Sequence, residues 1–184
     1  MTKTTDTPQT GGLLINYAGK NNYHNQTAIE YEIKYIAREN GKSKDDLICC
    51  GAMGATYFTN IDMTVREFQC VQLLYNRRGS FGRYIDHEIY SFSEEEENKI
   101  SQGNISLENI AKKMAQDFYA DGFQVYYGVH KPDKTETHIH VHFAVNTVNF
   151  RTGKKRHENM GDTQRRQDRL RQIVLAEMNN RQKL

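Results

Sequence analysis

The chain has 184 residues, of which 37% are hydrophobic, and a formal net charge of +2 at pH 7. This length supplies apolar residues for one core and leaves little room for a second, so we expect one compact domain. No stretch approaches the roughly 20 apolar residues of a membrane span, and no basic segment with an apolar run opens the chain, which predicts a cytoplasmic protein without membrane insertion. The three cysteines lack the spacing of a zinc or redox motif and are expected to be reduced thiols.

Charge is unevenly spread along the chain. Residues 151–184 contain ten Lys or Arg and only four Asp or Glu, whereas residues 94–97 are four consecutive acids. A basic segment can follow a phosphate backbone, because neutralising phosphates releases condensed counterions. On charge alone, a solvated helix face explains the same composition equally well.

The N-terminal residues predict a disordered lead-in followed by a strand. Residues 1–12 are polar and rich in Thr, which predicts a disordered segment before a single domain over residues 13–184. The domain is expected to open with a short strand over residues 13–17.

The first helix is expected over residues 27–40, with Gly41 as its C-cap. Its apolar residues recur at helical spacing and are Ile29, Ile33 and Ile36. Tyr31 and Tyr35 are four residues apart and therefore lie on one face of this helix, offset from the isoleucine stripe.

Later elements follow from periodicity and turn residues. They are a helix over residues 64–77, a strand over 83–92, a helix over 106–121, strands over 123–130 and 138–149, and a helix over 163–180. Thr64 and Glu67 form the capping-box pattern that opens the first of these helices. Short connections between neighbouring strands favour antiparallel pairing, with the interspersed helices covering one face of the sheet. The predicted fold class is α+β.

A strand rich in histidine stands out between residues 138 and 146. Its alternation places Ile139, Val141, Phe143 and Val145 on one face and His138, His140, His142 and Asn146 on the other. Side chains two residues apart on one strand face can converge on a single metal ion.

His130 closes the preceding strand, and an antiparallel hairpin would return it to the histidine strand. Histidines from two strands would leave coordination positions open for a substrate oxygen, which is typical of a catalytic metal site. The sequence leaves open which three of His130, His138, His140 and His142 bind together.

These residues carry a resemblance to a known family. The run from Thr137 to His142, followed by Asn146 and the Gly153 turn, resembles the metal-binding motif of the HUH endonucleases, and within them the conjugative and mobilisation relaxases of the P-type (MOBP) class. Ser91 before Phe92 is similar to the family's middle motif, and residues 33–38 to its N-terminal motif. The resemblance spans residues 30–157.

The resemblance implies a DNA strand transferase that nicks single-stranded DNA at an origin of transfer. Tyr35 would attack the scissile phosphate, leaving a 5′-phosphotyrosine bond and a free 3′-hydroxyl, and reversal would rejoin the strand. A divalent metal, Mn²⁺ or Mg²⁺, is the expected cofactor, with Zn²⁺, Co²⁺ or Ni²⁺ as alternatives in a purified sample. Accessory relaxosome proteins and a coupling protein are the expected partners. Since relaxases usually continue into further regions, we expect the chain to be truncated from a longer protein.

Further residues receive roles from the same resemblance. Tyr31 is the alternative nucleophile, ahead of Tyr17 and Tyr23. The expected DNA contacts are Ser91, Asn146, Arg83, Lys154 and Lys155, with Arg77 and Arg78 also holding phosphates. Asp86 is a candidate to orient a ligand histidine through its second ring nitrogen. Tyr84 and Tyr90 are candidates for base stacking.

Three other functions compete with this interpretation. A rolling-circle replication initiator of the same superfamily would use similar chemistry, but its tyrosine usually follows the histidines, and no tyrosine follows Asn146 here. A metal-dependent oxygenase or hydrolase outside the nucleases would need a carboxylate or fourth ligand and a small-molecule pocket. A non-catalytic DNA-binding module would make the histidines incidental.

Overall fold

The computed structural model describes residues 12–16, 23–25, 27–41, 43–75, 82–134, 136–157 and 159–181. The expected roles of Tyr17, Arg77 and Arg78, and the disorder expected for residues 1–11, lie outside these residues. Within them, five strands form one antiparallel sheet in the order β1-β3-β5-β4-β2. The strands are β1 (Leu13–Asn16), β2 (Leu47–Met53), β3 (Ile85–Ser91), β4 (Val125–His130) and β5 (His140–Asn146). The predicted α+β class with an antiparallel sheet is confirmed.

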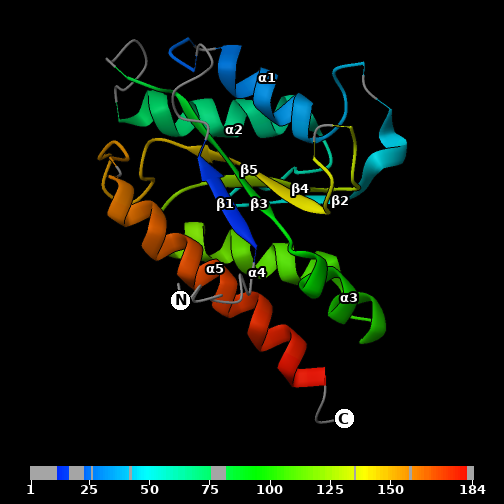
Figure 1. Ribbon diagram of the computed structural model, residues 1–184. Coiled ribbons are helices and arrows are strands. Elements are labelled where there is room, and N and C mark those ends of the chain that lie inside the picture. The colour runs from blue at the N-terminus through cyan, green and yellow to red at the C-terminus, as the bar shows by residue number, and fades with distance from the viewer. Residues whose placement is uncertain are drawn as a thin grey trace, which may run out of the picture.

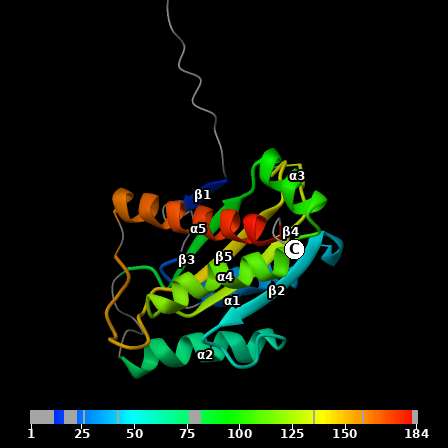
Figure 2. The same ribbon diagram turned by 90° about the horizontal axis from the view of Figure 1, so that it is seen from below.

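Three helices cover one face of the sheet: α3 (Glu94–Gln102), α4 (Leu107–Ala120) and α5 (Met160–Arg181). Seen from below, α4 and α5 lie side by side across the strands (Figure 2). Val141, Phe143 and Val145 of β5 pack into this core, which also contains Phe118 of α4 and Leu170 of α5. Alternation along β5 therefore predicted this face correctly.

Two helices cover the opposite face, α1 (Thr27–Ile36) and α2 (Ile61–Leu74), as Figure 1 shows above the sheet. The isoleucines of α1 pack there against Tyr126 of β4 and Ala144 of β5. The expectation that helices cover only one face is wrong, because the histidine face also carries apolar residues that require a second core.

Several element boundaries differ from the expectation. α1 ends at Ile36, four residues before the expected end. Arg38 (φ 57°) adopts the left-handed conformation after it, as does the expected C-cap residue Gly41. α2 begins at Ile61, where the Asn60 side chain accepts a hydrogen bond from the Met63 amide.

One strand and one α-helix were not predicted at all. β2 has an apolar sequence without alternation. α3 begins at a capping box between Ser93 and Glu96, a signal that the sequence did contain. No helix in the described part of the chain is long and apolar enough to cross a membrane.

Candidate active site

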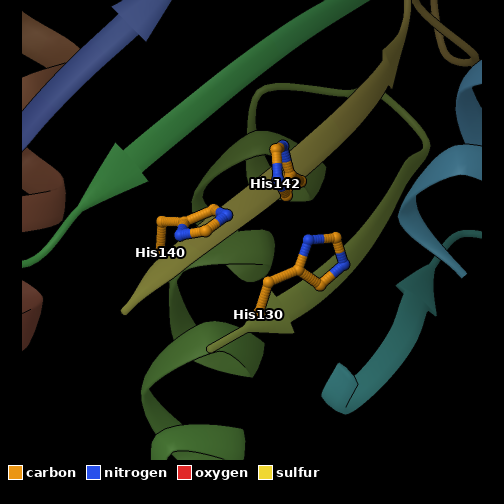
Figure 3. A group of neighbouring side chains, drawn as sticks. All are labelled: His130, His140 and His142. Atoms are coloured by element: carbon orange, nitrogen blue, oxygen red, sulfur yellow. The ribbon is translucent and has the colours of Figure 1, made fainter. Parts of the chain in front are cut away.

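Three histidines converge on the α1 side of the sheet (Figure 3). His130 ends β4 and lies directly opposite His140 in the β4–β5 register, and His142 follows two residues later on the same strand. One ligand atom from each ring lies within 4.8 Å of the others. The centroids of the His130 and His142 rings are 4.5 Å apart. The hairpin thus brings together His130, His140 and His142.

Hydrogen bonds determine which ring nitrogens remain for a metal ion. His130 Nε2 lies 2.8 Å from the Ile36 carbonyl oxygen, and His140 Nδ1 lies 2.8 Å from the His138 carbonyl oxygen. Because a carbonyl oxygen only accepts, both nitrogens are donors. His130 Nδ1 and His142 Nε2 are buried and have no hydrogen-bond partner among the residues that the structure describes. These orphaned nitrogens fit a divalent metal ion bound by His130 Nδ1, His140 Nε2 and His142 Nε2.

Close packing of α1 against β4 supports this arrangement. Gly128 lies opposite His142 in the strand register, and a Cβ there would come within 2.9 Å of the Ile36 carbonyl oxygen. A side chain at this position would push the end of α1 away from the sheet. Gly128 therefore allows the Ile36 carbonyl to reach and orient His130.

A second layer of polar groups lies behind His142. His87 Nε2 lies 2.8 Å from His142 Nδ1, and His87 Nδ1 lies 3.1 Å from Glu32 Oε2. Burial raises the pKa of Glu32 to about 7, and burial lowers the pKa of His87 to about 4. If His142 binds a metal through Nε2, its Nδ1–H donates to His87, whose own N–H then donates to the Glu32 carboxylate.

The sequence interpretation missed both His87 and Glu32. Alternation along β3 could have found His87, since Ile89 and Ser91 are on the same strand face. It cannot find Glu32, because that contact joins a helix to a strand 55 positions away. Helical spacing does place Glu32 on the isoleucine face of α1, but it says nothing of its partner.

Two predicted residues lie elsewhere. His138 precedes β5, is half-exposed, and its Nδ1 lies 3.3 Å from Glu97 Oε2, so it is not part of the cluster. The expectation that Asp86 orients a ligand histidine is wrong, since its carboxylate binds Arg83 and Arg156. Neighbouring strand residues face opposite sides of the sheet, and His87 takes the position that Asp86 was given.

The expected nucleophile borders the cluster. The Tyr35 ring meets the His142 ring edge to face, with centroids 5.4 Å apart. Tyr35 and the exposed Tyr31 line a cavity of about 260 Å³ together with His140 and His142. The remaining residues that line this cavity are Tyr23, Glu32, His87, Ile89, Asp133 and Glu136. Of the tyrosines lining this cavity, Tyr35 is the one with a ring contact to the cluster.

Two of the expected DNA contacts on the sheet have different environments. Ser91 is partly exposed and pairs directly with His140 in the β3–β5 register, which places both side chains on one face. Asn146 is fully buried, and its amide donates to the Phe68 carbonyl and to Gln124 Oε1. The structure leaves Asn146 no surface for DNA and gives it the role of joining α2 to the sheet.

The basic residues near the Gly153 turn also separate into two kinds. Lys154 is exposed, whereas Lys155 Nζ donates to the Arg83 carbonyl oxygen at 2.6 Å. Arg83 itself forms an ion pair with Asp86 and is partly exposed. Lys154 thus has the greatest freedom to meet a phosphate.

The two tyrosines proposed for base stacking are buried. Tyr84 is 4% exposed and Tyr90 is not exposed, with its hydroxyl donating to Glu96. Stacking on bases requires an accessible ring face, so the structure contradicts this expectation for both residues.

Comparison with known proteins adds to this geometry. A family model described as the nuclease domain of MobA/VirD2-like relaxases matches residues 19–178. The chain belongs to the relaxase family. A comparison with curated proteins found no match. As a relaxase nuclease domain it is a DNA-binding, DNA-nicking enzyme, and the matched residues include α1, the cavity and all three cluster histidines.

Proposed function

We propose that this relaxase domain is a metal-dependent strand transferase that nicks single-stranded DNA at an origin of transfer and forms a 5′-phosphotyrosine bond through Tyr35. The observation that carries the proposal is the contact between the Tyr35 and His142 rings, which both line the cavity. A phosphate bound at the histidine cluster would lie next to a phenol on a rigid helix. Proximity of this kind can supply a large part of a rate enhancement.

His130, His140 and His142 would hold the divalent metal. When bound, the ion supplies positive charge to the non-bridging oxygens of the scissile phosphate. Neutral imidazoles leave that charge undiminished, and burial lowers the pKa of His130 to about 4, so the ring is neutral at physiological pH. We expect Mn²⁺ or Mg²⁺ in the cell, and Zn²⁺, Co²⁺ or Ni²⁺ as alternatives in a purified sample.

The covalent step conserves the phosphodiester bond energy. The Tyr35 oxygen forms a bond to phosphorus as the P–O3′ bond breaks, and the 3′-oxygen leaves with the bonding electrons. The phenol proton passes to water and the 3′-oxygen gains a proton, so no nucleotide cofactor is consumed. Reversal by a 3′-hydroxyl restores the strand and frees Tyr35. Tyr31, one turn away and exposed, would help to place the DNA.

DNA recognition is expected to use exposed groups around the cavity. Ser91 lies beside His140 and can donate a hydrogen bond to the strand near the nick. Lys154 and the partly exposed Arg83 can contact backbone phosphates, with Lys155 adding charge behind them. Accessory relaxosome proteins and a coupling protein are the proposed partners at the origin of transfer.

An adduct assay tests this proposal. Purified protein with Mn²⁺ is incubated with a pool of random-sequence single-stranded oligonucleotides that carry a fluorophore at the 3′ end. A 5′-phosphotyrosine bond retains the 3′ label on the protein in a denaturing gel, whereas a 5′ label should be released on a shorter strand. Sequencing of the captured DNA identifies the nick site.

EDTA and a double-stranded version of the captured sequence are the controls, and both should prevent adduct formation. Retention of the 5′ label instead would reverse the proposed polarity. Metal-loaded protein that forms no adduct from the pool would contradict the proposed function.

A further inference from the structure

Arg38 is a buried arginine in a backbone conformation that arginine rarely adopts. It follows α1 with a φ of 57°, and its side chain is 1% exposed. The Arg38 amide donates to the Tyr35 carbonyl and the Glu39 amide to the Lys34 carbonyl, at 3.2 and 2.8 Å. This pair of hydrogen bonds forms a Schellman motif, whose left-handed position is usually glycine. The sequence has arginine at a position where glycine would fit the backbone better.

The guanidinium of Arg38 is only partly paired. Its Nη2 lies 3.0 Å from Asp46 Oδ2, while Nε and Nη1 are buried and have no hydrogen-bond partner among the described residues. Burying a charged group with unused donors is costly. Both the strained backbone and the incomplete pairing therefore oppose folding, which indicates that the side chain has another role.

The neighbours of Arg38 indicate that role. Its guanidinium carbon lies 5.3 Å from the centroid of the Tyr35 ring, within the range of a cation–π contact. The same Tyr35 ring also meets the His142 ring edge to face, with the two centroids 5.4 Å apart. The Tyr35 ring therefore contacts both a buried cation and a ring of the histidine cluster.

We propose that Arg38 is a positioning residue for Tyr35: the buried guanidinium fixes the phenol ring against the cluster and adds a permanent positive charge beside the phosphate site. This inference rests on the proposed function of Tyr35. A flexible lysine could supply charge there but not a flat surface for the ring. A glycine would relieve the backbone and supply neither.

A cation in this position should also repel the metal ion. Removal of the Arg38 charge is therefore expected to leave Mn²⁺ affinity unchanged or to tighten it, while adduct formation slows. General damage to the fold would weaken both properties together. This opposite behaviour separates a role toward Tyr35 from a merely structural one.

The test compares Arg38→Met, Arg38→Lys and Arg38→Gly with wild type. Mn²⁺ binding is measured by calorimetry, and single-turnover adduct formation is measured with saturating captured oligonucleotide, per metal-loaded molecule. We expect Arg38→Met to slow adduct formation about 100-fold, the size of effect that a misplaced reacting group produces. Arg38→Lys should recover part of this rate because it restores the charge.

Arg38→Gly distinguishes stability from chemistry. It should melt at a higher temperature than Arg38→Met, since glycine tolerates the left-handed backbone, yet be equally slow. Arg156→Met is the matched control, because it removes an equally buried guanidinium that binds Asp86 and Glu88 on the other sheet face. That variant should lose stability but keep its adduct rate per folded molecule.

Two outcomes would overturn the inference. One is that Arg38→Met forms the adduct at the same rate as the wild-type protein. The other is loss of Mn²⁺ affinity in parallel with the rate in every Arg38 variant. Failure of the wild-type protein itself to form an adduct would instead contradict the proposed function.

Discussion

On the face of the sheet covered by α4 and α5, Arg156 binds the carboxylates of Asp86 and Glu88 on β3. On the face covered by α1, the rings of His130 and His142 converge, and one nitrogen of each has no hydrogen bond to any residue that the structure describes. Both faces of one sheet bury polar groups. On the α4 side a buried cation has two carboxylate partners, which is the ordinary requirement for stability. On the α1 side the proposed partner is a metal ion, which folding alone does not supply.

Burial of a polar residue therefore does not by itself indicate function in this domain. What distinguishes the α1 side is that two imidazole nitrogens without a hydrogen bond, on His130 and His142, converge on one point with the His140 ring. Each such group is a cost to folding that a bound ligand or a reacting group can offset.

The sharpest way to break this comparison is to remove the nucleophile and leave the fold intact. Tyr35→Phe deletes one hydroxyl from a ring packed against His142. Adduct formation should fall at least about 1,000-fold, because the metal site would have no nucleophile to assist. Mn²⁺ binding, measured by calorimetry, should be unchanged.

Tyr31→Phe is the control, since Tyr31 is exposed one turn earlier on the same helix. It should retain most of the rate. If mass spectrometry places the nucleotide on Tyr31, the transferase proposal stands and Tyr35 is not the nucleophile.

Loss of a cluster histidine tests whether the orphaned nitrogens bind metal. His142→Ala should weaken Mn²⁺ binding by about 100-fold or more, since even residues that only orient ligands contribute 10- to 100-fold. His138→Ala is the matched control on the same segment and should bind Mn²⁺ as wild type does, because His138 contacts Glu97 instead. Equal losses in the two variants would place His138 among the ligands.

Acid–base behaviour of the metal-free protein tests the second layer. Burial raises the pKa of Glu32 from 4.5 to about 7, so the folded state binds this proton more tightly than the unfolded state. The stabilisation is complete below pH 4.5 and is lost as pH rises toward 7. Glu32→Gln keeps a neutral side chain, and its melting temperature should therefore exceed that of wild type by roughly 5–10 °C at pH 8 and by much less at pH 5.

Glu30→Gln provides the comparison for that measurement, because it alters an exposed carboxylate on the same helix. The difference in melting temperature between Glu30→Gln and wild type should not grow with pH in the same way. A Glu32→Gln difference that is constant from pH 5 to pH 8 would show that Glu32 does not titrate in this range.

The smallest effect concerns the exposed cations. Lys154→Ala should reduce the slope of log affinity against log salt concentration by about 0.7, the value for one phosphate contact with single-stranded DNA. Lys112→Ala removes an exposed lysine from α4, on the other face of the sheet, and should leave the slope unchanged. Equal slopes for Lys154→Ala and wild type would assign Lys154 to solubility. Fluorescence anisotropy with the captured oligonucleotide gives both slopes.

Sequence periodicity correctly predicted features that depend on one helix or strand alone. The alternation around His140 and His142 separated the core face of β5 from the polar face, and Ser106 marked the start of α4 correctly. Periodicity could not predict that helices cover both faces, since that depends on how much apolar surface the assembled sheet presents on each face. β2 was missed because a strand without alternation gives no period-two signal.

The candidate site shows the same division. Hairpin geometry made His130 a candidate, but only strand register distinguishes it from His138 as the partner of His140. Motif resemblance placed Asn146 and Tyr90 at the DNA, yet both are buried in the fold. Tertiary contacts from α1 and α2 decide these positions, and a single sequence does not display them.

The place of β5 at the centre of the sheet has a further consequence. It is hydrogen-bonded to β3 on one side and to β4 on the other, and it carries two of the three cluster histidines. Amides of such a strand exchange with solvent only when the whole sheet opens. The two proposed metal ligands on β5 therefore belong to the slowest-exchanging part of the molecule, and their placement does not depend on a bound ion. A chelator should strip the ion and leave a folded apoprotein, in contrast to small zinc modules that collapse without their metal.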